Sequence, residues 1–429
     1  MHAKSQRFLH SVLALSVAAI ALPAFADGFV DDAKVNLNLR NFYFNRNYLS
    51  YGGTKATRGQ ADEWTQSFIL DAKSGFTTGT VGFGVDVLGL WSIKLDGGGG
   101  TYGTQLLPVH DGNQPASEFG RLAVAPKMKF SKTELKVGEW MPVLPIVRAD
   151  DGRSLPQTLK GGQITSKEIQ NLTLYGGQFS GNSQRNDASM ERLSLNNADK
   201  VVHGSPTVSG DHFNYGGAEY TFNDKHTLVG AWYGQLEDIY HQKYFQILHS
   251  QPIADGITAG ANLGYFIGDT DGTGLAGDQD NRTMSGLFSL KVGFNTFYVG
   301  LQKVMGAANW QRISGTSGGT LANDSYGWSY ELKGEKSWQI RDDYDFAGLG
   351  IPGLTFMTRF IEGTNVHANG VTDGEDRGRE SELAYVFQSG TFKNLTLRWR
   401  NSTLRRDYSA ANTSFDENRV ILQYPISIL

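Results

Sequence analysis

The chain has 429 residues, with 39 lysines and arginines against 43 aspartates and glutamates, and it contains no cysteine. The slightly acidic balance excludes the electrostatics typical of a nucleic-acid-binding protein, and the lack of cysteine excludes disulfides and cysteine-ligated metals. The 53 glycines, 18 tyrosines and 24 phenylalanines, set against only 11 prolines, favour an all-β chain with many turns.

The N-terminal segment has the features of a secretory signal peptide. Lys4 and Arg7 precede an apolar run, and Ala24-Phe25-Ala26 supplies small residues at a cleavage position. The apolar run is too short to anchor the chain in a bilayer. We therefore expect residues 1–26 to be removed and residues 27–429 to form a single domain. Loss of the two basic residues leaves 37 lysines and arginines against 43 acids, a net charge of −6.

Apolar and polar residues alternate repeatedly along the mature chain, as in strands that have one apolar face. The clearest segments are residues 35–40, 81–87, 121–130, 296–302, 354–360 and 395–402. A soluble sheet would bury the apolar face, whereas a membrane barrel turns it to lipid and the polar face to a water-filled lumen. No apolar run after the signal is long enough for a spanning helix, which excludes a helical membrane protein.

Two kinds of interruption separate these segments. The stretch "PVLPIVRADDGRSLPQTLKGG", residues 142–162, combines prolines with a Gly-Arg-Ser break, which predicts a loop that folds instead of pairing. Glycine- and aspartate-rich stretches such as "GDTDGTGLAGDQDN", residues 268–281, are typical of long surface loops. The aspartates of that stretch could bind calcium, but the ligand spacing and terminal glutamate of a calcium loop are absent, so a solvated loop is favoured.

The C-terminal segments carry arginines on the polar face of strands. In "TLRWRNS", Leu397 and Trp399 point one way, and Arg398 and Arg400 point the other. In "RVILQYPISIL", Arg419 shares the polar face. This last segment is similar to the C-terminal strand of outer-membrane barrels, although it ends on leucine instead of an aromatic residue.

The length of the mature chain limits the number of strands that a barrel could have. A tilted membrane strand needs about 9 to 11 residues, and the mature chain leaves roughly 20 to 25 residues for each strand and turn if the strands number 16 to 18. The sequence therefore predicts an all-β fold, a transmembrane antiparallel β-barrel of about 18 strands.

Five stretches of the mature chain carry a family resemblance. They are "DGFVDDAKVNLNLRNFYFNR", "TVGFGVDVLGLW", "KTELKVGEWMPVLPIVRADDGRSLPQTLKGGQI", "DYDFAGLGIPGLTFMTRF" and "YVFQSGTFKNLTLRWR". In this order they resemble the signatures of the OprD-type substrate-specific porins, or carboxylate channels. The resemblance implies an eighteen-stranded barrel in the outer membrane of a Gram-negative bacterium, with inward-folded loops that form an eyelet and a ladder of basic residues. "RADDGRSLPQTLKGGQITSKEI" looks like the branch that takes up benzoate- and vanillate-like aromatic acids.

Strand alternation and closure of the barrel predict which cations line one wall. The candidate substrate-binding residues there are Arg359, Arg398, Arg400, Arg419 and Arg40. A guanidinium stays charged and matches a carboxylate in a bidentate pair, and a row of weak sites allows passage where one strong site would trap the solute. The alternative is that these arginines pair with acids for purely structural reasons.

Further candidate cations follow from the loop and from another strand. The resemblance makes Arg153 an eyelet cation and Arg148 a second candidate, with Leu155 and Ile146 available to contact an aromatic ring. Asp150 and Asp151 either hold these arginines or oppose them across the eyelet. Lys127 and Lys129, on the polar face of residues 121–130, complete the candidate substrate-binding set.

No motif indicates an enzyme. The chain has neither a Gly-x-Ser-x-Gly elbow nor a His-Glu-x-x-His metal site, so we expect no catalytic residue, no metal and no cofactor. The expected function is passive diffusion of small carboxylates such as benzoate or vanillate, and uptake of basic amino acids or peptides is the alternative. An enzymatic barrel, or a structural barrel with a plugged lumen, is the third class; the plugged form would carry no current. Expected partners are carboxylate solutes, outer-membrane lipid and lipopolysaccharide, and the barrel-assembly machinery, with the barrel a monomer or weak trimer.

Overall fold

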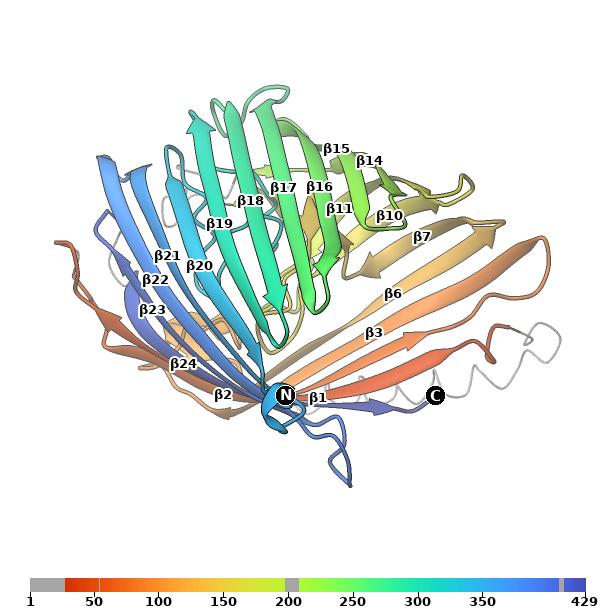
Figure 1. Ribbon diagram of the computed structural model, residues 1–429, viewed down its shortest axis with the longest axis horizontal. Helices are drawn as coiled ribbons and strands as arrows, with labels where there is room; N and C mark the ends of the chain where they lie inside the picture. The colour runs from red at the N-terminus through yellow and green to blue at the C-terminus, as the bar shows by residue number, and fades with distance from the viewer. Residues whose placement is uncertain (1–27, 54, 197–207, 409–412) are drawn as a thin grey trace.

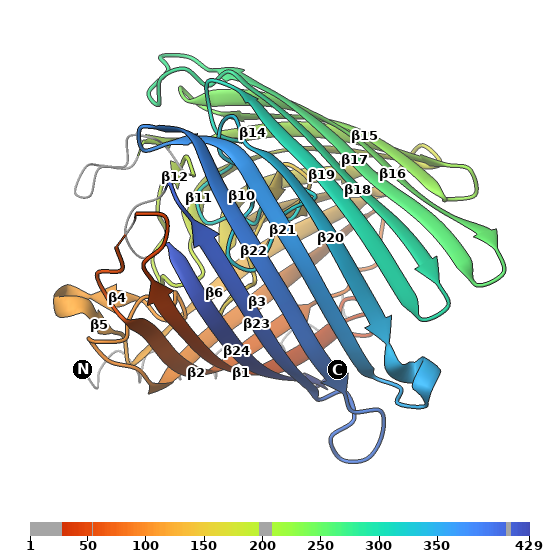
Figure 2. The ribbon, with the colours of Figure 1, turned by 60° about the vertical axis from the view of Figure 1, so that its left-hand side comes forward.

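The computed structural model describes residues 28–53, 55–196, 208–408 and 413–429 of the chain. These residues form an 18-stranded antiparallel sheet in which every strand pairs with its neighbours in sequence, and β1 (Lys34–Leu49) also pairs with β24 (Ser414–Ser427). The sheet is therefore a closed barrel, drawn in Figures 1 and 2. The predicted all-β barrel of about 18 strands is confirmed. The expected signal peptide lies outside the described residues.

The other barrel strands follow in chain order. They are β2 (Gln60–Lys73), β3 (Val81–Asp96), β6 (Glu118–Phe130), β7 (Thr133–Trp140), β10 (Thr158–Ser166), β11 (Leu172–Ser183), β14 (Phe213–Phe222), β15 (Thr227–Leu236), β16 (Tyr240–Ala254), β17 (Ile257–Thr270), β18 (Asn281–Val292), β19 (Asn295–Gly306), β20 (Lys336–Asp345), β21 (Leu354–Ala368), β22 (Val371–Val386) and β23 (Thr396–Arg406). Short two-stranded pieces lie in the connections: β4 (Val109–His110), β5 (Gln114–Pro115), β8 (Val143–Leu144), β9 (Val147–Arg148), β12 (Leu193–Ser194) and β13 (Ser209–Gly210).

Helical structure is confined to two short 3-10 turns in the described part of the chain, η1 (Asp111–Asn113) and η2 (Phe346–Leu349). In the same ranges there is no helix of the length and apolarity that a bilayer crossing requires.

The two ends of the barrel differ in the length of their connections. The end at which β1 begins and β24 ends has short turns, such as residues 131–132 and 293–294, whereas the other end has long connections, such as residues 97–117 and 307–335. Outer-membrane barrels place short turns in the periplasm and long loops outside the cell. We therefore call the end with the long connections the extracellular end.

The predicted alternation is observed in the register of the strands. On β19, Phe297, Val299 and Leu301 are exposed on the outer face, while Gln302 is buried inside. On β23, Leu397 and Trp399 are likewise exposed outside. Because these apolar side chains have no protein neighbours to cover them, their outer face is suited to lipid.

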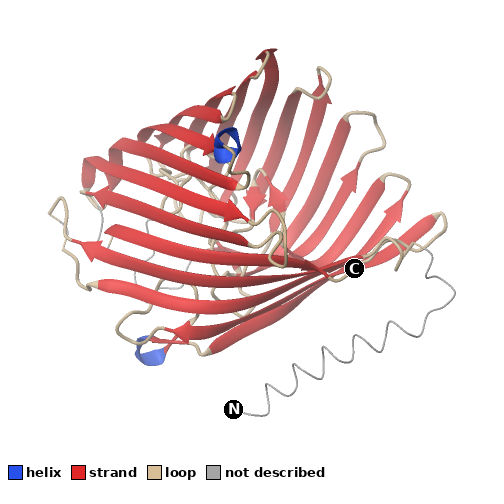
Figure 3. Ribbon diagram, turned by 60° about the horizontal axis from the view of Figure 1, so that its bottom comes forward, coloured by secondary structure: helices blue, strands red, loops and turns tan. Residues whose placement is uncertain are grey.

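Two long loops fold into the barrel instead of extending from it, and Figure 3 shows the strands enclosing loop segments. Residues 141–157, between β7 and β10, carry the small hairpin of β8 and β9. Residues 307–335 connect β19 and β20. We refer to these segments as the 141–157 loop and the 307–335 loop.

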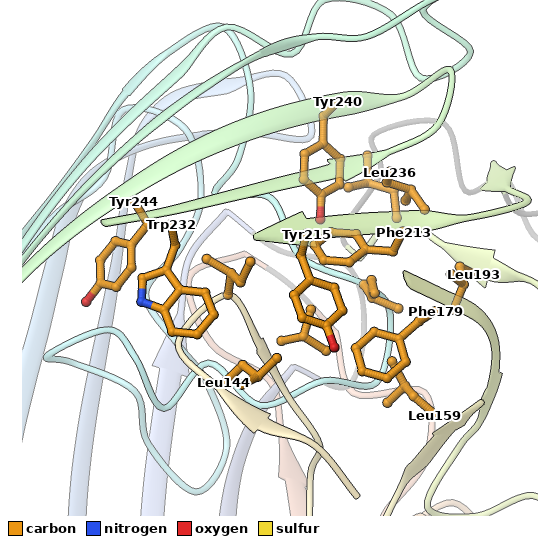
Figure 4. Close-up of a cluster of buried hydrophobic side chains, with 14 of the residues drawn as sticks. Leu144, Leu159, Phe179, Leu193, Phe213, Tyr215, Trp232, Leu236, Tyr240 and Tyr244 are labelled. Atoms are coloured by element: carbon orange, nitrogen blue, oxygen red, sulfur yellow. The ribbon is translucent and has the colours of Figure 1, made fainter. Parts of the chain in front are cut away.

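Apolar side chains hold the 141–157 loop against one side of the barrel wall. Leu144, Ile146 and Val147 of the loop pack with inward aromatic residues of β11 and of β14 to β17. Figure 4 shows Leu144 facing this group, which includes Phe179, Phe213, Tyr215, Trp232, Tyr240 and Tyr244. We call this side of the lumen the aromatic wall.

A second apolar cluster holds the end of the same loop. Leu155 packs with Phe42 and Phe44 of β1 and with residues of β2, β3 and the 97–117 connection. The loop is thus bound at both ends, and the space that it leaves runs along strands β21 to β1.

Candidate functional site

The predicted wall of arginines is present on neighbouring strands. Arg359 of β21, Arg398 and Arg400 of β23, Arg419 of β24 and Arg40 of β1 all point to the inside. Strand alternation alone places them there, because each occupies the face opposite to the exposed apolar residues of its strand. We call this group, on the segment from β21 to β1, the arginine wall.

Acids from the same strands compensate the arginine wall in part. The Arg359 guanidinium binds Glu380 of β22 at 2.5 Å. Glu382, two residues further along β22, binds Arg400 and lies 3.2 Å from Arg398. These pairs hold the guanidinium groups in fixed orientations, which is the arrangement that a bidentate carboxylate requires.

Glu417 of β24 has the same role between two arginines. Its carboxylate binds Arg419 at 2.5 Å and Arg46 of β1 at 2.5 Å. The Arg46 guanidinium also stacks over the Phe415 ring, with 3.9 Å between the guanidinium carbon and the ring centre.

Asp150 and Asp151 bind arginines other than Arg148 and Arg153, the two that the sequence analysis considered. Asp151 accepts two hydrogen bonds from Arg40, of 2.8 and 3.0 Å. Asp150 forms an ion pair of 2.8 Å with Arg185. The 141–157 loop is therefore attached to the arginine wall by charge, as it is to the aromatic wall by apolar packing.

Arg153, the predicted eyelet cation, belongs to the 141–157 loop and contacts Arg40 of the arginine wall through its backbone carbonyl. Its Nε donates to the Thr104 carbonyl at 2.9 Å, and its guanidinium carbon lies 5.1 Å from the centre of the Phe44 ring. Burial, together with repulsion from Arg185 and Arg419, lowers the pKa of Arg153 well below its usual value. A carboxylate beside Arg153 would stabilise the charged guanidinium and so counteract this lowering of its pKa. Arg153 is therefore a favourable contact for a carboxylate.

Tyr326, from the 307–335 loop, covers the middle of the arginine wall. Its ring centre lies 4.1 Å from the guanidinium carbon of Arg400, 5.3 Å from that of Arg359 and 5.6 Å from that of Arg419. The hydroxyl donates to Glu382 at 3.0 Å, and the backbone carbonyl accepts from Arg419 at 2.8 Å. Burial raises the pKa of Tyr326 to about 12, so the phenol stays neutral near pH 7.

Two cavities meet at Tyr326. The outer cavity, of about 370 Å³, is lined by Arg46, Arg153 and Arg312 as well as Tyr326. The inner cavity, of about 600 Å³, lies toward the short turns and is lined by Lys291, Arg341, Arg359 and Arg400 as well as Tyr326. Volumes of this size suit a small organic solute. Cations thus line the space on both sides of Tyr326.

Charges around this path do not cancel. The outer cavity is lined by four arginines (Arg46, Arg153, Arg185 and Arg312) and two acids (Asp150 and Asp324). The inner cavity is lined by four cations (Lys291, Arg341, Arg359 and Arg400) and three acids (Asp343, Asp345 and Glu382). The cations of the two cavities thus exceed the acids by three. The site can therefore attract an anion although the protein as a whole is acidic.

Other predicted cations lie away from the arginine wall. Lys127 pairs with Asp86 of β3 at 2.7 Å near the periplasmic turns, and the exposed Lys129 lies 5.6 Å from the Phe76 ring centre. Arg148 is exposed and beside Gly319 of the 307–335 loop. Leu155 and Ile146 are almost fully buried in the two apolar clusters, so the expectation that they contact a solute ring is wrong.

Four residues that line the outer cavity were not predicted from the sequence. Arg46 shares the inward face with Arg40, so extension of the β1 alternation would have found it. Arg312 and Arg185 come from irregular connections, and Tyr326 lies in a Gly- and Ser-rich stretch without periodicity. No local pattern marks these three residues.

The described ranges contain no group of three or more His, Cys, Asp or Glu side chains placed to hold a metal. In the aspartate-rich stretch considered for calcium, Asp269 and Asp280 each bind Arg282 at 3.1 Å.

The chain is similar to known proteins over nearly its whole length. The family described as "outer membrane porin, OprD family" matches residues 27–428. The porin-like protein GalP of Pseudomonas putida is 62% identical over 412 residues, 96% of each chain. A BenF-like porin from Pseudomonas fluorescens Pf-5 has 62% identity and a TM-score of 0.89, covering 94% of this chain and 100% of that one.

Two solved structures from Pseudomonas aeruginosa are described with a bound solute. OccK2 (OpdF) in complex with glucuronate has 55% identity and a TM-score of 0.84, covering 94% of this chain and all of that one. OpdK with vanillate has 43% identity and a TM-score of 0.86, covering 93% of this chain and all of that one.

Proposed function

We propose that this chain, which belongs to the OprD family of outer-membrane porins, conducts small carboxylates by passive diffusion along the arginine wall. Family membership makes it a substrate-specific porin of the Gram-negative outer membrane and not an enzyme, as the sequence predicts. Its preferred solutes are compact aromatic monocarboxylates such as benzoate and vanillate. The relatives with bound glucuronate and vanillate support the carboxylate class.

The single observation that carries the proposal is the surplus of arginine charge on both sides of Tyr326. A carboxylate that enters the outer cavity meets Arg153 and Arg46, and beyond Tyr326 it meets Arg359, Arg400 and Arg341 in the inner cavity. Each guanidinium already shares its charge with an acid, except that Arg153 has only carbonyl partners. Such contacts are individually weak, and conduction needs weak contacts in series.

An aromatic solute also finds a complementary surface on this path. The Tyr326 ring and the guanidinium planes around it can stack on a flat ring, while an arginine beside them binds the carboxylate. Uptake of basic amino acids is the second candidate, because Asp150 and Asp324 line the outer cavity and could receive a cationic group.

Planar-bilayer recording tests the proposal. Under a salt gradient the wild-type channel is expected to favour anions, and benzoate or vanillate is expected to block uptake of a labelled aromatic acid in liposomes. Arginine is expected to have no such effect. Block by arginine and not by benzoate would transfer the proposal to basic amino acids.

A pair of variants separates the arginine wall from arginine content in general. Arg400→Ala removes a cation of the inner cavity and is expected to slow uptake of the aromatic acid. Arg405→Ala, on the outer face of the same strand, removes an arginine paired with Asp416 and is expected to transport as the wild type does. If Arg153→Ala leaves uptake unchanged while Arg398→Ala abolishes it, the eyelet role of Arg153 is wrong and selectivity resides on the wall.

A further inference from the structure

Two exposed lysines face each other on the outer surface without an acidic partner. Lys303 of β19 is directly paired with Lys336 of β20, and both side chains are exposed. Side chains in such a pair lie about 4.5–5.5 Å apart at Cβ, and like charges there repel each other. Among the described residues neither ammonium group has an acid within ion-pair distance. The pair is therefore destabilising unless an anion joins it.

Neighbouring outward cations behave differently. Arg282 of β18 binds Asp269 and Asp280, Arg377 of β22 binds Glu362 and Glu375, and Arg405 of β23 binds Asp416. Lys243 of β16 and Arg379 of β22 are also exposed on the outer face without an acidic partner among the described residues, but each is a single cation. The lysine pair differs because two such cations face each other on neighbouring strands.

An apolar groove begins at the same pair. It has a volume of about 750 Å³ and runs over β16 to β20, with Phe245, Leu263, Met284, Phe288 and Leu301 among its lining residues and the two lysines at its extracellular end. Gly286 makes the groove hollow, because it lies on the outer face between Leu263 and Leu301, its partners on β17 and β19. A Cβ at Gly286 would lie only 3.3 Å from the Leu263 side chain.

Position in the membrane defines what could occupy the groove. Lys303 lies near the end of β19 where the long 307–335 loop begins, so the lysine pair is on the extracellular side. Trp338 follows Lys336 by two residues on the outer face, as expected of the aromatic girdle at the membrane interface. The groove itself lies below, in the hydrocarbon of the outer leaflet.

We infer that this groove and lysine pair form a binding site for lipopolysaccharide, through the acyl chains and phosphates of its lipid A portion. The groove takes acyl chains by apolar contact, and the two ammonium groups bind phosphate on the headgroup. Lipopolysaccharide is the phosphorylated amphiphile of the outer leaflet, which is the leaflet that the lysine position selects. Its two phosphates suit two adjacent cations better than the single phosphate of a phospholipid does.

Native mass spectrometry of the purified full-length porin in non-ionic detergent tests this site. Bisphosphorylated lipid A is expected to bind at lower concentration than monophosphoryl lipid A or phosphatidylglycerol. The double variant Lys303→Gln/Lys336→Gln is expected to weaken lipid A binding about 30-fold, the effect of two lysines facing an anionic lipid surface. Phosphatidylglycerol binding equal to that of lipid A would overturn the assignment to lipopolysaccharide.

Two further variants separate the charge from the groove. Arg377→Gln removes an outward cation that already has acidic partners and is expected to leave lipid A binding unchanged. Gly286→Leu fills the hollow and is expected to weaken lipid A binding while the lysines remain. All variants are expected to keep wild-type conductance, which confirms that they fold. Lipid A binding that is unaffected by the double lysine variant would refute the site.

Discussion

Replacement of Tyr326 tests the constriction most directly. In Tyr326→Ala the loop loses three ring contacts with guanidinium groups, at 4.1, 5.3 and 5.6 Å. Each is worth about 0.5–1 kcal/mol, or about 2 kcal/mol together. It also loses the hydrogen bond from the hydroxyl to Glu382, worth about 1.5–3 kcal/mol because the acceptor is charged. Tyr326→Phe loses only the hydrogen bond.

These values predict different behaviour for the two variants. Because Tyr326 borders both cavities, its removal joins them, so Tyr326→Ala is expected to have a higher single-channel conductance in KCl and weaker block by benzoate. Tyr326→Phe keeps the ring and is expected to conduct almost as the wild type does. The temperature of barrel unfolding is expected to change little in either, because the lost contacts join a loop to the wall and no pairing between strands is removed.

An exposed tyrosine on the outer face provides the control for Tyr326→Ala. Tyr220→Ala removes an exposed tyrosine from the outer face of β14 and is expected to leave conductance and block unchanged. Wild-type conductance and wild-type benzoate block in Tyr326→Ala would show that the narrowest point lies elsewhere.

Three other perturbations have defined outcomes. Leu397→Arg places a charge in lipid and is expected to lower the yield of folded barrel, at a cost of up to about 2–4 kcal/mol, whereas Arg400→Ala folds normally; equal yields in a gel-shift folding assay would contradict the register. Burial raises the pKa of Asp324 to about 6, so this carboxyl group, at the outer cavity, is neutral in acid and anionic above that value. Anion selectivity, read from reversal potentials, is expected to rise as the pH falls through about 6, and Asp324→Asn is expected to show the acid level throughout. Burial, and the nearby Asp376, raise the pKa of Glu335 well above its usual value, so the folded loop holds a proton that the unfolded chain releases above about pH 4.5. Attachment of the 307–335 loop is therefore expected to weaken as the pH rises above that value, measured as faster hydrogen exchange after correction for intrinsic rates, and Glu335→Gln is expected to remove this dependence.

The strands and their orientation could be predicted because one face of each had to be apolar. Leu397 and Arg398 are adjacent in sequence, and the two-residue period assigns them to opposite sides without any knowledge of the partner strands. The same rule placed Arg359 and Arg419 on the inside. Closure then placed Arg40 beside them, because the last strand pairs with the first.

The content of the lumen was harder to predict. Phe213, Tyr215 and Trp232 are inward aromatic residues, and alternation alone gives no reason to expect an apolar lumen wall. The 141–157 loop explains them, because its apolar side chains are buried by packing against these aromatic residues inside the barrel. Glu380 and Glu382 were missed as partners because β22 has charged residues on both faces, so its inward face had no distinct pattern.

The position of the closing seam has a consequence for how the protein matures. Arg40, Phe44 and Arg46 are near the beginning of the chain, Glu417 and Arg419 are near its end, and they come together only when β1 pairs with β24. An unfinished barrel therefore lacks the contacts between arginines and acids that, on the proposed function, discriminate between solutes. Selectivity would then be acquired in the final joining step, which closes the barrel wall and assembles these contacts at the same time.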